Sequence, residues 1–159
     1  MNDLIKLLNQ NARFSNEQLA AMLGTTPADV AAQIEKLEQN GVIKGYSVIL
    51  DESLADKDMV MAIIELKVTP QRDCGFDEIA KTIMMYDEVD SISLMSGSYD
   101  LSVTVKGKNL QDIALFVAQR LSTIEGVLST TTHFILKTYK EKGIFIEDEG
   151  KDERGFVAP

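Results

Sequence analysis

Apolar residues recur at helical spacing in three stretches near the start of the chain. Residues 4–8, Leu-Ile-Lys-Leu-Leu, place their apolar side chains on one face and predict a first short helix. A second helix is predicted between Ser15 and Gly24. Ser15 and Gln18 have the spacing of a capping box, and Gly24 is a typical residue just past a helix end.

A third helix is predicted from Thr26 onward. Thr26 is a favoured N-cap, Pro27 suits the first helical position, and Asp29 completes a second capping box. Gly41 is the expected left-handed stop. Three short helices with a glycine-containing turn between the second and third describe a helix-turn-helix, although an ordinary three-helix bundle gives the same pattern.

The pattern then changes from helical spacing to alternation. Val42, Tyr46, Val48 and Leu50 predict an extended strand over residues 42–50. Residues 51–58 are mostly polar and read as a connector. We therefore expect a first domain over residues 1–50, a linker over 51–58 and a second domain over 59–140.

The second domain is predicted to run β-α-β-β-α-β. Its strands are expected at residues 59–68, 91–94, 101–105 and 127–139, and its helices at 76–86 and between Asn109 and Gly126. This order is that of a ferredoxin-like α+β fold, in which both helices cover one face of an antiparallel sheet.

Apolar side chains are expected on both faces of that sheet. Ile63, Leu66 and Val68 flank Ile64 in the first strand. Phe134 and Leu136 alternate with Ile135 in the last one. An apolar sheet face that the helices leave uncovered would be buried by another copy of the chain. The pattern therefore predicts a homo-oligomer.

Charge and composition narrow the choice of partners. The formal net charge is −9, which is unfavourable for binding DNA unless the basic side chains are grouped. The single cysteine, Cys74, excludes an intramolecular disulfide and fits a reducing compartment. Neither a signal peptide nor an apolar run long enough to cross a bilayer is present, so we expect a cytoplasmic protein without a membrane partner.

The sequence offers little for catalysis or for a cofactor. His133 is the only histidine and Cys74 the only cysteine, so neither a His/Cys metal cluster nor a Cys–His nucleophile can form in one chain. We expect no enzyme activity, no catalytic residues, no metal and no cofactor. Residues 141–159 form an acidic tail whose apolar residues suggest packing on a neighbouring subunit.

Three motifs together resemble the leucine-responsive regulator/AsnC (Lrp/AsnC) family of transcription factors. They are LLNQNARFSNEQLAAMLGTTPADV at residues 7–30, IEKLEQNGVIKGYSVILD at 34–51 and GSYDLSVTV at 97–105. The resemblance implies a winged helix-turn-helix that binds double-stranded DNA. It also implies a RAM or ACT-like domain that binds amino acids or related metabolites and builds dimers, which assemble into tetramers or octamers.

The DNA-binding half departs from the family pattern. Members usually carry arginine where this chain has Ala32 and Gln33, and residues 1–45 hold four basic side chains against five carboxylates. Three interpretations stay open: weak binding by each of several linked modules, contacts through polar side chains, and a helical domain that no longer binds DNA. The candidate DNA-contacting residues are Arg13, Thr25, Thr26, Gln33, Lys36 and Lys44.

The effector half matches the family better. The resemblance places an effector near the turn between the second and third strands, at Ser96, Gly97, Ser98, Tyr99 and Asp100. A glycine turn lets backbone N–H groups approach a carboxylate, and an aspartate can pair with an α-ammonium group. The alternative is a simple hairpin turn capped by Asp100. Thr130 and Thr132 either line the same cleft or are ordinary strand residues.

The sequence thus predicts a sequence-specific DNA-binding transcription regulator that responds to an amino acid or a related small metabolite. The alternative is a metabolite-binding oligomer of the same fold whose helix-turn-helix binds DNA weakly or not at all.

Overall fold

The computed structural model describes residues 3–55, 58–70 and 75–146. The chain divides into two compact units, Met1–Val48 and Ile49–Pro159. Within the described residues, no helix has both the length and the apolar character that crossing a membrane requires.

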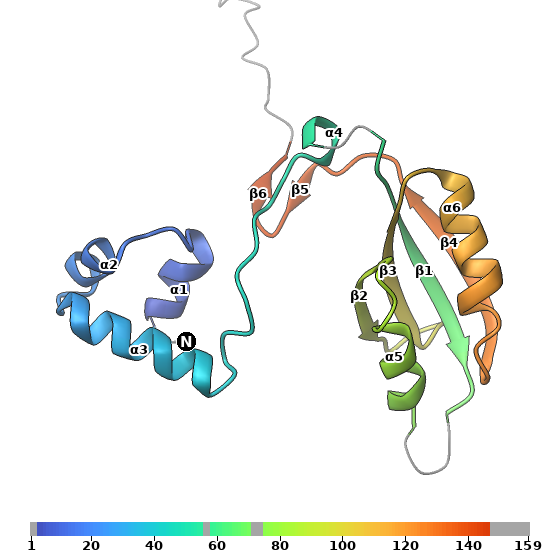
Figure 1. Cartoon of the computed structure of the whole chain (residues 1–159), viewed down its shortest axis with the longest axis horizontal. Coiled ribbons are helices and arrows are strands. Elements are labelled where there is room, and N and C mark those ends of the chain that lie inside the picture. Colours follow the sequence, from blue (N-terminus) through green and yellow to red (C-terminus); the bar gives the residue numbers. More distant parts are fainter. Residues whose placement is uncertain (1–2, 56–57, 71–74, 147–159) are drawn as a thin grey trace, which may run out of the picture. The chain divides into compact units, whose positions relative to one another are not determined.

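The first unit consists of three helices (Figure 1): α1 (Asp3–Gln10), α2 (Asn16–Leu23) and α3 (Pro27–Gln39). Leu4, Leu19, Ala20 and Val30 are fully or almost fully buried between them. Partly buried side chains complete this small core: Leu7, Leu8, Phe14, Leu23, Ile34 and Leu37. The three-helix fold predicted from the sequence is confirmed.

Local capping explains where α2 begins and ends. The Ser15 hydroxyl accepts a hydrogen bond from the Gln18 N–H at 3.2 Å, and the Gln18 side chain accepts one from the Ser15 N–H at 2.9 Å. Gly24 adopts the left-handed conformation with φ of 67°, which side chains with a Cβ rarely adopt. The predicted capping box and the glycine turn before α3 are both present.

Residues 43–50 form no strand, so the extended strand predicted over residues 42–50 is wrong for the single chain. The alternating apolar side chains are instead exposed, at 59% for Val42, 55% for Tyr46, 71% for Val48 and 50% for Leu50. A strand needs a neighbour to pair its backbone groups, and no described segment pairs with this one. Alternation alone does not supply that neighbour.

The second unit contains the predicted β-α-β-β-α-β order. Its elements are α4 (Glu52–Ala55), β1 (Val60–Val68), α5 (Asp77–Ile83), β2 (Val89–Leu94), β3 (Leu101–Gly107), α6 (Leu110–Phe116) with one π-helical turn (Val117–Leu121), and β4 (Val127–Ile135). A small hairpin follows, formed by β5 (Lys140–Glu141) and β6 (Ile144–Phe145). The last large strand ends four residues before the predicted position, and a short helix lies inside the predicted linker.

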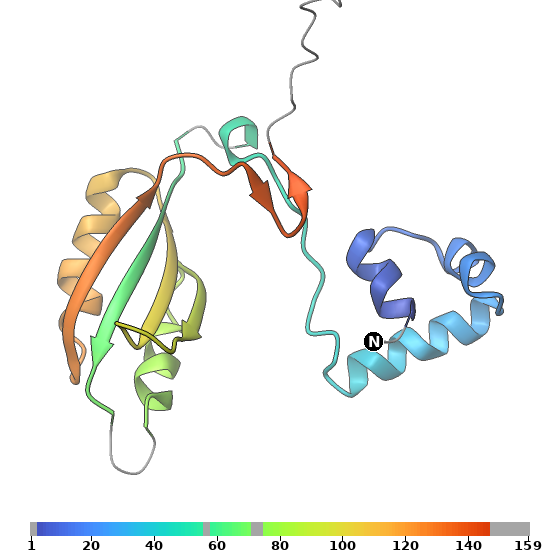
Figure 2. The ribbon, with the colours of Figure 1, turned by 180° about the vertical axis from the view of Figure 1, so that it is seen from behind.

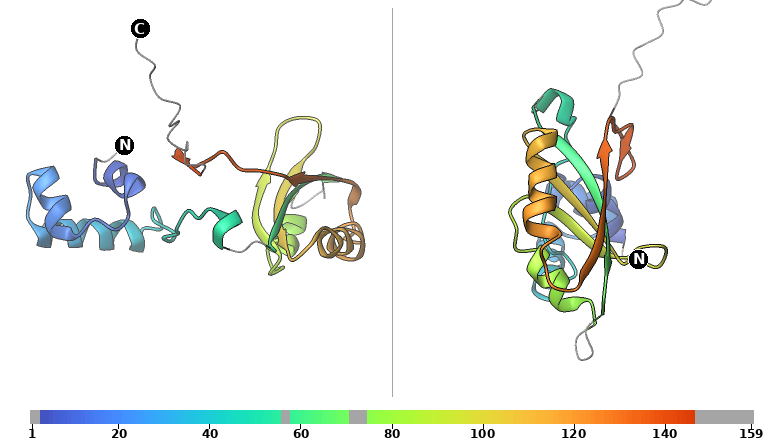
Figure 3. Two further views of the ribbon diagram at one scale, coloured as in Figure 1. Left: turned by 90° about the horizontal axis from the view of Figure 1, so that it is seen from above. Right: turned by 90° about the vertical axis from the view of Figure 1, so that its right-hand side faces the viewer.

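The four long strands form one antiparallel sheet in the order β2-β3-β1-β4. Helices α5 and α6 cover the same face of this sheet (Figure 3). The core lies between these two helices and the sheet. Its buried members are Ala62, Ile64, Leu66, Val68, Ile79, Ile83, Leu101, Val103, Val105, Ile113, Phe116, Val117 and Leu121. The predicted ferredoxin-like fold is confirmed.

The other face of the sheet is turned toward the viewer in Figure 2. Its register-paired residues are more polar than the sequence pattern predicts. Strand register places Ile63, Thr104 and His133 side by side on this face, followed by Glu65, Ser102 and Thr131. Among its register-paired residues, apolar side chains are confined to Met61, Ile63 and Ile135. Leu66 and Phe134 belong to the helix-covered face, and Leu136 lies beyond the strand with 95% of its surface exposed.

Most of the acidic tail lies outside the described residues. Its first six residues, 141–146, are described and include the turn and second strand of the small hairpin. Lys140 lies over the ring of Phe145, 4.8 Å from its centre.

Candidate DNA-binding and effector-binding sites

The outward surface of α3 is the candidate DNA-reading surface. Val30, Ile34 and Leu37 pack into the core of the first unit, which fixes the orientation of the helix. The remaining surface of α3 exposes small or neutral side chains in its N-terminal half, namely Ala28, Ala31, Ala32 and Gln33. In a helix-turn-helix, the recognition helix, which is α3 in this chain, contacts base edges through residues near its N-terminal end.

The carboxylates of α3 are held by neighbouring donors. Asp29 accepts hydrogen bonds from the hydroxyls of Thr26 at 2.7 Å and Thr25 at 3.1 Å. These two hydroxyls, that of Thr26 first, lower the pKa of Asp29. The hydroxyls of both predicted threonines therefore donate their hydrogen bonds within the turn. Toward DNA, these residues can still offer their backbone groups and their hydroxyl oxygens as acceptors.

Two further carboxylates lie along the same helix. Glu35 accepts a hydrogen bond from the Gln39 side chain at 3.1 Å, and Glu38 accepts one from the Tyr46 hydroxyl at 2.9 Å. Burial and the contact with Glu38 raise the pKa of Tyr46. The sequence analysis did not single out Tyr46 for this contact.

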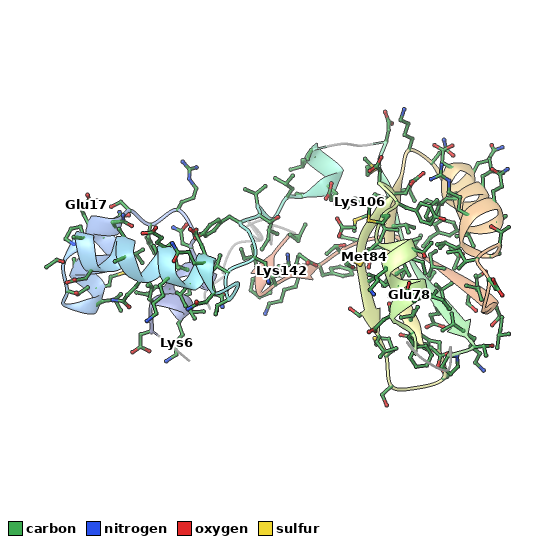
Figure 4. All side chains as sticks on the ribbon, turned by 60° about the horizontal axis from the view of Figure 1, so that its bottom comes forward. Lys6, Glu17, Glu78, Met84, Lys106 and Lys142 are labelled. Carbon is green, nitrogen blue, oxygen red and sulfur yellow. The ribbon has the colours of Figure 1, made fainter. Side chains whose placement is uncertain are left out.

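The basic side chains of the first unit differ in their availability. Lys6 is paired with Asp3 at 2.7 Å and points away from the helices (Figure 4), and this contact lowers the pKa of Asp3. The charged groups of Arg13, Lys36 and Lys44 have no partner within the part of the chain that is described, and all three residues are exposed. The backbone N–H of Arg13 is bonded to the Asn11 side chain at 2.9 Å.

The turn over residues 96–100 is tied firmly to the sheet through Asp100. The backbone N–H of Asp100 donates to the Leu66 carbonyl at 2.9 Å, and its own carbonyl accepts from the Met95 N–H at 2.8 Å. The Asp100 carboxylate accepts a hydrogen bond from the Val68 N–H at 2.8 Å. One carboxylate oxygen is thus engaged at the end of β1, so Asp100 ties the turn to this neighbouring strand.

The tip of this turn is open. Ser96, Gly97 and Ser98 are exposed, whereas Tyr99 and Asp100 are half-buried. A Cβ atom placed on Gly97 would meet no heavy atom within 4 Å, and Gly97 does not have a left-handed backbone. The fold of one chain therefore does not require glycine at this position.

Thr130 and Thr132 do not join the turn within one chain. In the sheet register they pair with Leu66 and Ile64, so they point toward the helix-covered face. The Thr130 hydroxyl lies 3.4 Å from the Ser122 hydroxyl, at the end of the π-helical turn.

The side chains of Lys106 and His133 make contacts in the second unit that the sequence did not predict. Lys106 lies between Asp90, at 3.1 Å, and Glu52, at 3.4 Å, and the hydrogen bond with Asp90 is the main cause of its raised pKa (Figure 4). His133 lies 3.4 Å from Glu65 on the uncovered sheet face. Both involve residues far apart in sequence, for which no local motif exists.

Outside the two candidate sites, the described residues include a shallow cavity that no predicted effector residue lines, but no metal-binding cluster. Within residues 3–55, 58–70 and 75–146, no group of His, Cys, Asp or Glu side chains is arranged to hold a metal ion. The shallow cavity of about 300 Å³ is lined by Glu78, Ile79, Thr82, Ile124 and Glu125, none of which was a predicted site residue.

A helix-turn-helix unit joined to a ferredoxin-like unit defines a class of regulator in which one part contacts DNA and the other a ligand. Residues 2–44 match the winged helix-turn-helix DNA-binding family, and residues 61–145 match the Lrp/AsnC ligand binding domain. The chain belongs to the Lrp/AsnC family, as its sequence motifs predicted. It is a helix-turn-helix transcription regulator with a domain that responds to small metabolites.

Individual relatives agree with this assignment. The chain is 44% identical over 158 residues to YugG of Bacillus subtilis, an uncharacterized HTH-type transcriptional regulator, covering 99% of this chain and 95% of that protein. It is 25% identical to the leucine-responsive regulatory protein of Haemophilus influenzae, covering 89% of this chain and 87% of that one.

Solved structures share the fold. A transcriptional regulator from Neisseria meningitidis, solved as a complex with L-methionine, superposes with a TM-score of 0.71 at 21% identity, covering 87% of this chain and 88% of that chain.

Proposed function

We propose that this protein is an amino-acid-responsive regulator that binds double-stranded DNA through α3 and an effector at the turn over residues 96–100. The observation that carries the proposal is the open tip of this turn on a base fixed by Asp100. Gly97 leaves room for a ligand to approach the backbone, and Ser96 and Ser98 offer hydroxyls beside it. The L-methionine complex of the Neisseria relative supports an amino acid as effector.

The effector's carboxylate fits this tip better than its ammonium group. Backbone N–H groups and the serine hydroxyls are donors, and donors suit an anion. The carboxylate of Asp100 is already bonded to Val68, so its role is to hold the turn in position. A neighbouring copy of the chain supplies the rest of the site, because the tip is exposed in one chain.

The proposed assembly is a homodimer that forms tetramers or octamers. Met61, Ile63 and Ile135 form an apolar strip on the sheet face that no helix covers. The alternating apolar side chains of residues 42–50 are also exposed. Burial of these surfaces between copies would remove apolar area from water. This would stabilise the assembly by roughly 25 cal/mol for each Å² of apolar surface buried.

DNA contacts in the proposal come from the exposed polar groups of the first unit. Arg13, Lys36 and Lys44 neutralise phosphates, Gln33 contacts bases, and the backbone around Thr25 and Thr26 contacts the sugar-phosphate chain. Three phosphate contacts per unit are few, so tight binding requires several units in one assembly. We place this action in the cytoplasm and assign the protein no catalytic step.

A second candidate is a metabolite-binding oligomer whose helical unit no longer binds DNA. It is favoured by the single basic residue of α3, Lys36, and by the carboxylates that lie along the same helix. A mobility shift with the DNA upstream of its own gene separates the two candidates. A shift at about 50 mM salt that disappears at higher salt supports regulation through DNA, whereas no shift at about 50 mM supports the second candidate.

The effector half has its own test. Unfolding temperature is measured with each of the common amino acids. A ligand present at about 100 times its dissociation constant adds about 2.7 kcal/mol of stability, which is readily measured. If no amino acid raises the unfolding temperature, the assignment of the turn as an amino-acid site is wrong.

A further inference from the structure

We propose that Gln33 reads an adenine in the major groove, while Ala28 and Ala32 contact thymine methyl groups, so that the operator presents A·T pairs to the N-terminal half of α3. This inference rests on the proposed DNA binding. It goes further by naming the bases that are recognised and the side chains that recognise them.

The side chain of Gln33 is available for a contact with DNA. It is exposed and has no hydrogen-bond partner among the described residues. The other exposed amide of α3, that of Gln39, is bonded to Glu35. Gln33 is therefore the neutral hydrogen-bonding side chain of this helix that remains free to meet a base.

The amide of Gln33 matches the major-groove edge of adenine. Glutamine carries an NH₂ donor and a carbonyl acceptor side by side. In the major groove, adenine presents an acceptor at N7 beside a donor at N6, which the amide matches with two hydrogen bonds. Guanine presents two acceptors at the same place and prefers arginine or lysine.

Two small apolar side chains are also exposed on α3, on a different side of the helix from Gln33. Ala28 and Ala32 are exposed and lie one helical turn apart, so their methyl groups share one side of the helix. Apolar contacts in the major groove are made with the C5-methyl group of thymine. Two small apolar side chains and one free amide, all exposed on one helix, suit A·T pairs at neighbouring positions of the groove.

The charged side chains of α3 are compatible with the assignment of base contacts to Gln33, Ala28 and Ala32. Asp29, Glu35 and Glu38 are held by hydrogen bonds to Thr25 and Thr26, Gln39 and Tyr46 respectively. Lys36 is the single basic residue of α3 and lies a turn nearer its C-terminal end than Ala32. Since base contacts concentrate toward the N-terminal end of a recognition helix, we assign Lys36 to a phosphate.

The test begins with selection from randomised duplex DNA by the full-length protein at about 50 mM salt. The selected site is then rebuilt with 7-deazaadenine, which lacks the N7 acceptor, at one adenine at a time. At the adenine that Gln33 reads, this change should weaken wild-type binding about 5- to 100-fold. Gln33→Ala should bind the unmodified site more weakly by a similar factor and show no further loss with 7-deazaadenine.

Uracil substitution tests the alanines. Replacing a contacted thymine by uracil removes only its methyl group and should weaken wild-type binding, whereas Ala32→Gly should respond less. Gln39→Ala is the matched control, since Gln39 is exposed on the same helix but engaged with Glu35. Circular dichroism of each variant confirms that the helices are retained.

The outcomes separate the inference from the proposal beneath it. Failure to enrich any DNA would overturn DNA binding and this inference together. Enriched sites with an invariant guanine opposite α3, or a wild-type affinity that 7-deazaadenine leaves unchanged at every adenine, would overturn the base assignment alone. DNA binding would then stand.

Discussion

The carboxylate of Asp100 and the backbone N–H of Val68 are joined by a hydrogen bond of 2.8 Å, although the two residues are 32 positions apart in the sequence. The bond links the candidate effector turn to the end of β1. It lies where the pairing of β1 with β4 shifts register, between Lys67 and Val68. The turn and this irregular strand end therefore form one connected structure.

Replacing Asp100 separates its positioning role from direct contact with an effector. Asp100→Ala removes the acceptor and should destabilise the second unit by about 1–3 kcal/mol while weakening effector binding. Asp100→Asn keeps a carbonyl acceptor for the Val68 N–H and should retain most of both. Thermal unfolding with and without the amino acid measures these effects. Loss of amino-acid binding in Asp100→Asn at unchanged stability would instead indicate that the charge pairs with the ligand's ammonium group.

Gly97→Val should abolish effector binding and leave stability almost unchanged. The added side chain meets open space within one chain, so it obstructs only what approaches the turn from outside. Calorimetric titration with the amino acid and thermal unfolding without it are the two measurements. Gly24→Val is the contrasting variant, because a left-handed φ of 67° makes a branched side chain strained there. An intact effector affinity in Gly97→Val would remove the turn tip from the binding site.

The contacts of Lys106 should be visible in the alkaline stability of the protein. Its pKa is raised in the folded state, chiefly by Asp90, so its contribution is complete below the unfolded pKa and is lost as pH rises through the folded pKa. Lys106→Met should therefore be less stable than wild type near pH 8, with the difference shrinking toward pH 12. Urea unfolding across this range measures it. A difference that stays constant with pH would show that packing, and not charge, accounts for the effect of the substitution.

Salt dependence should count the phosphate contacts. If Arg13, Lys36 and Lys44 each neutralise one phosphate, the slope of log affinity against log salt is about −2.7 for each bound unit. Alanine at any one of them should make the slope less steep by about 0.9 per unit. Lys6→Ala is the control, because Lys6 is paired with Asp3. Equal slopes for Lys36→Ala and Lys6→Ala would exclude Lys36 from the phosphate contacts.

The parts of the fold that the sequence predicts well are those controlled by neighbours along the chain. Ser15, Gly24 and Thr26 set the ends of α2 and α3 through contacts within four residues. The order of elements in the second unit likewise follows from local periodicity. The bond between Asp100 and Val68 could not be predicted in this way, because it joins strands that are distant in sequence and meet only after folding.

The polar character of the uncovered sheet face could not be predicted from the sequence for a related reason. β1 is apolar almost throughout, so its sequence alone does not reveal which residues face the helices. Only pairing with β3 and β4 shows that Ile63 has Thr104 and His133 beside it. Similarly, alternation in residues 42–50 predicts a strand, although a strand also needs a partner, and no described segment pairs with this stretch.

If the exposed alternating side chains of residues 42–50 are buried between copies in the proposed assembly, dilution would expose them again. A ribbon with apolar groups at 50–71% exposure costs free energy for as long as each chain is alone in water. Early association of newly synthesised copies would therefore lower the free energy and prevent this exposed segment from pairing with an unpaired strand of another protein. The amount of protein in the cell would then decide how much of it is able to work.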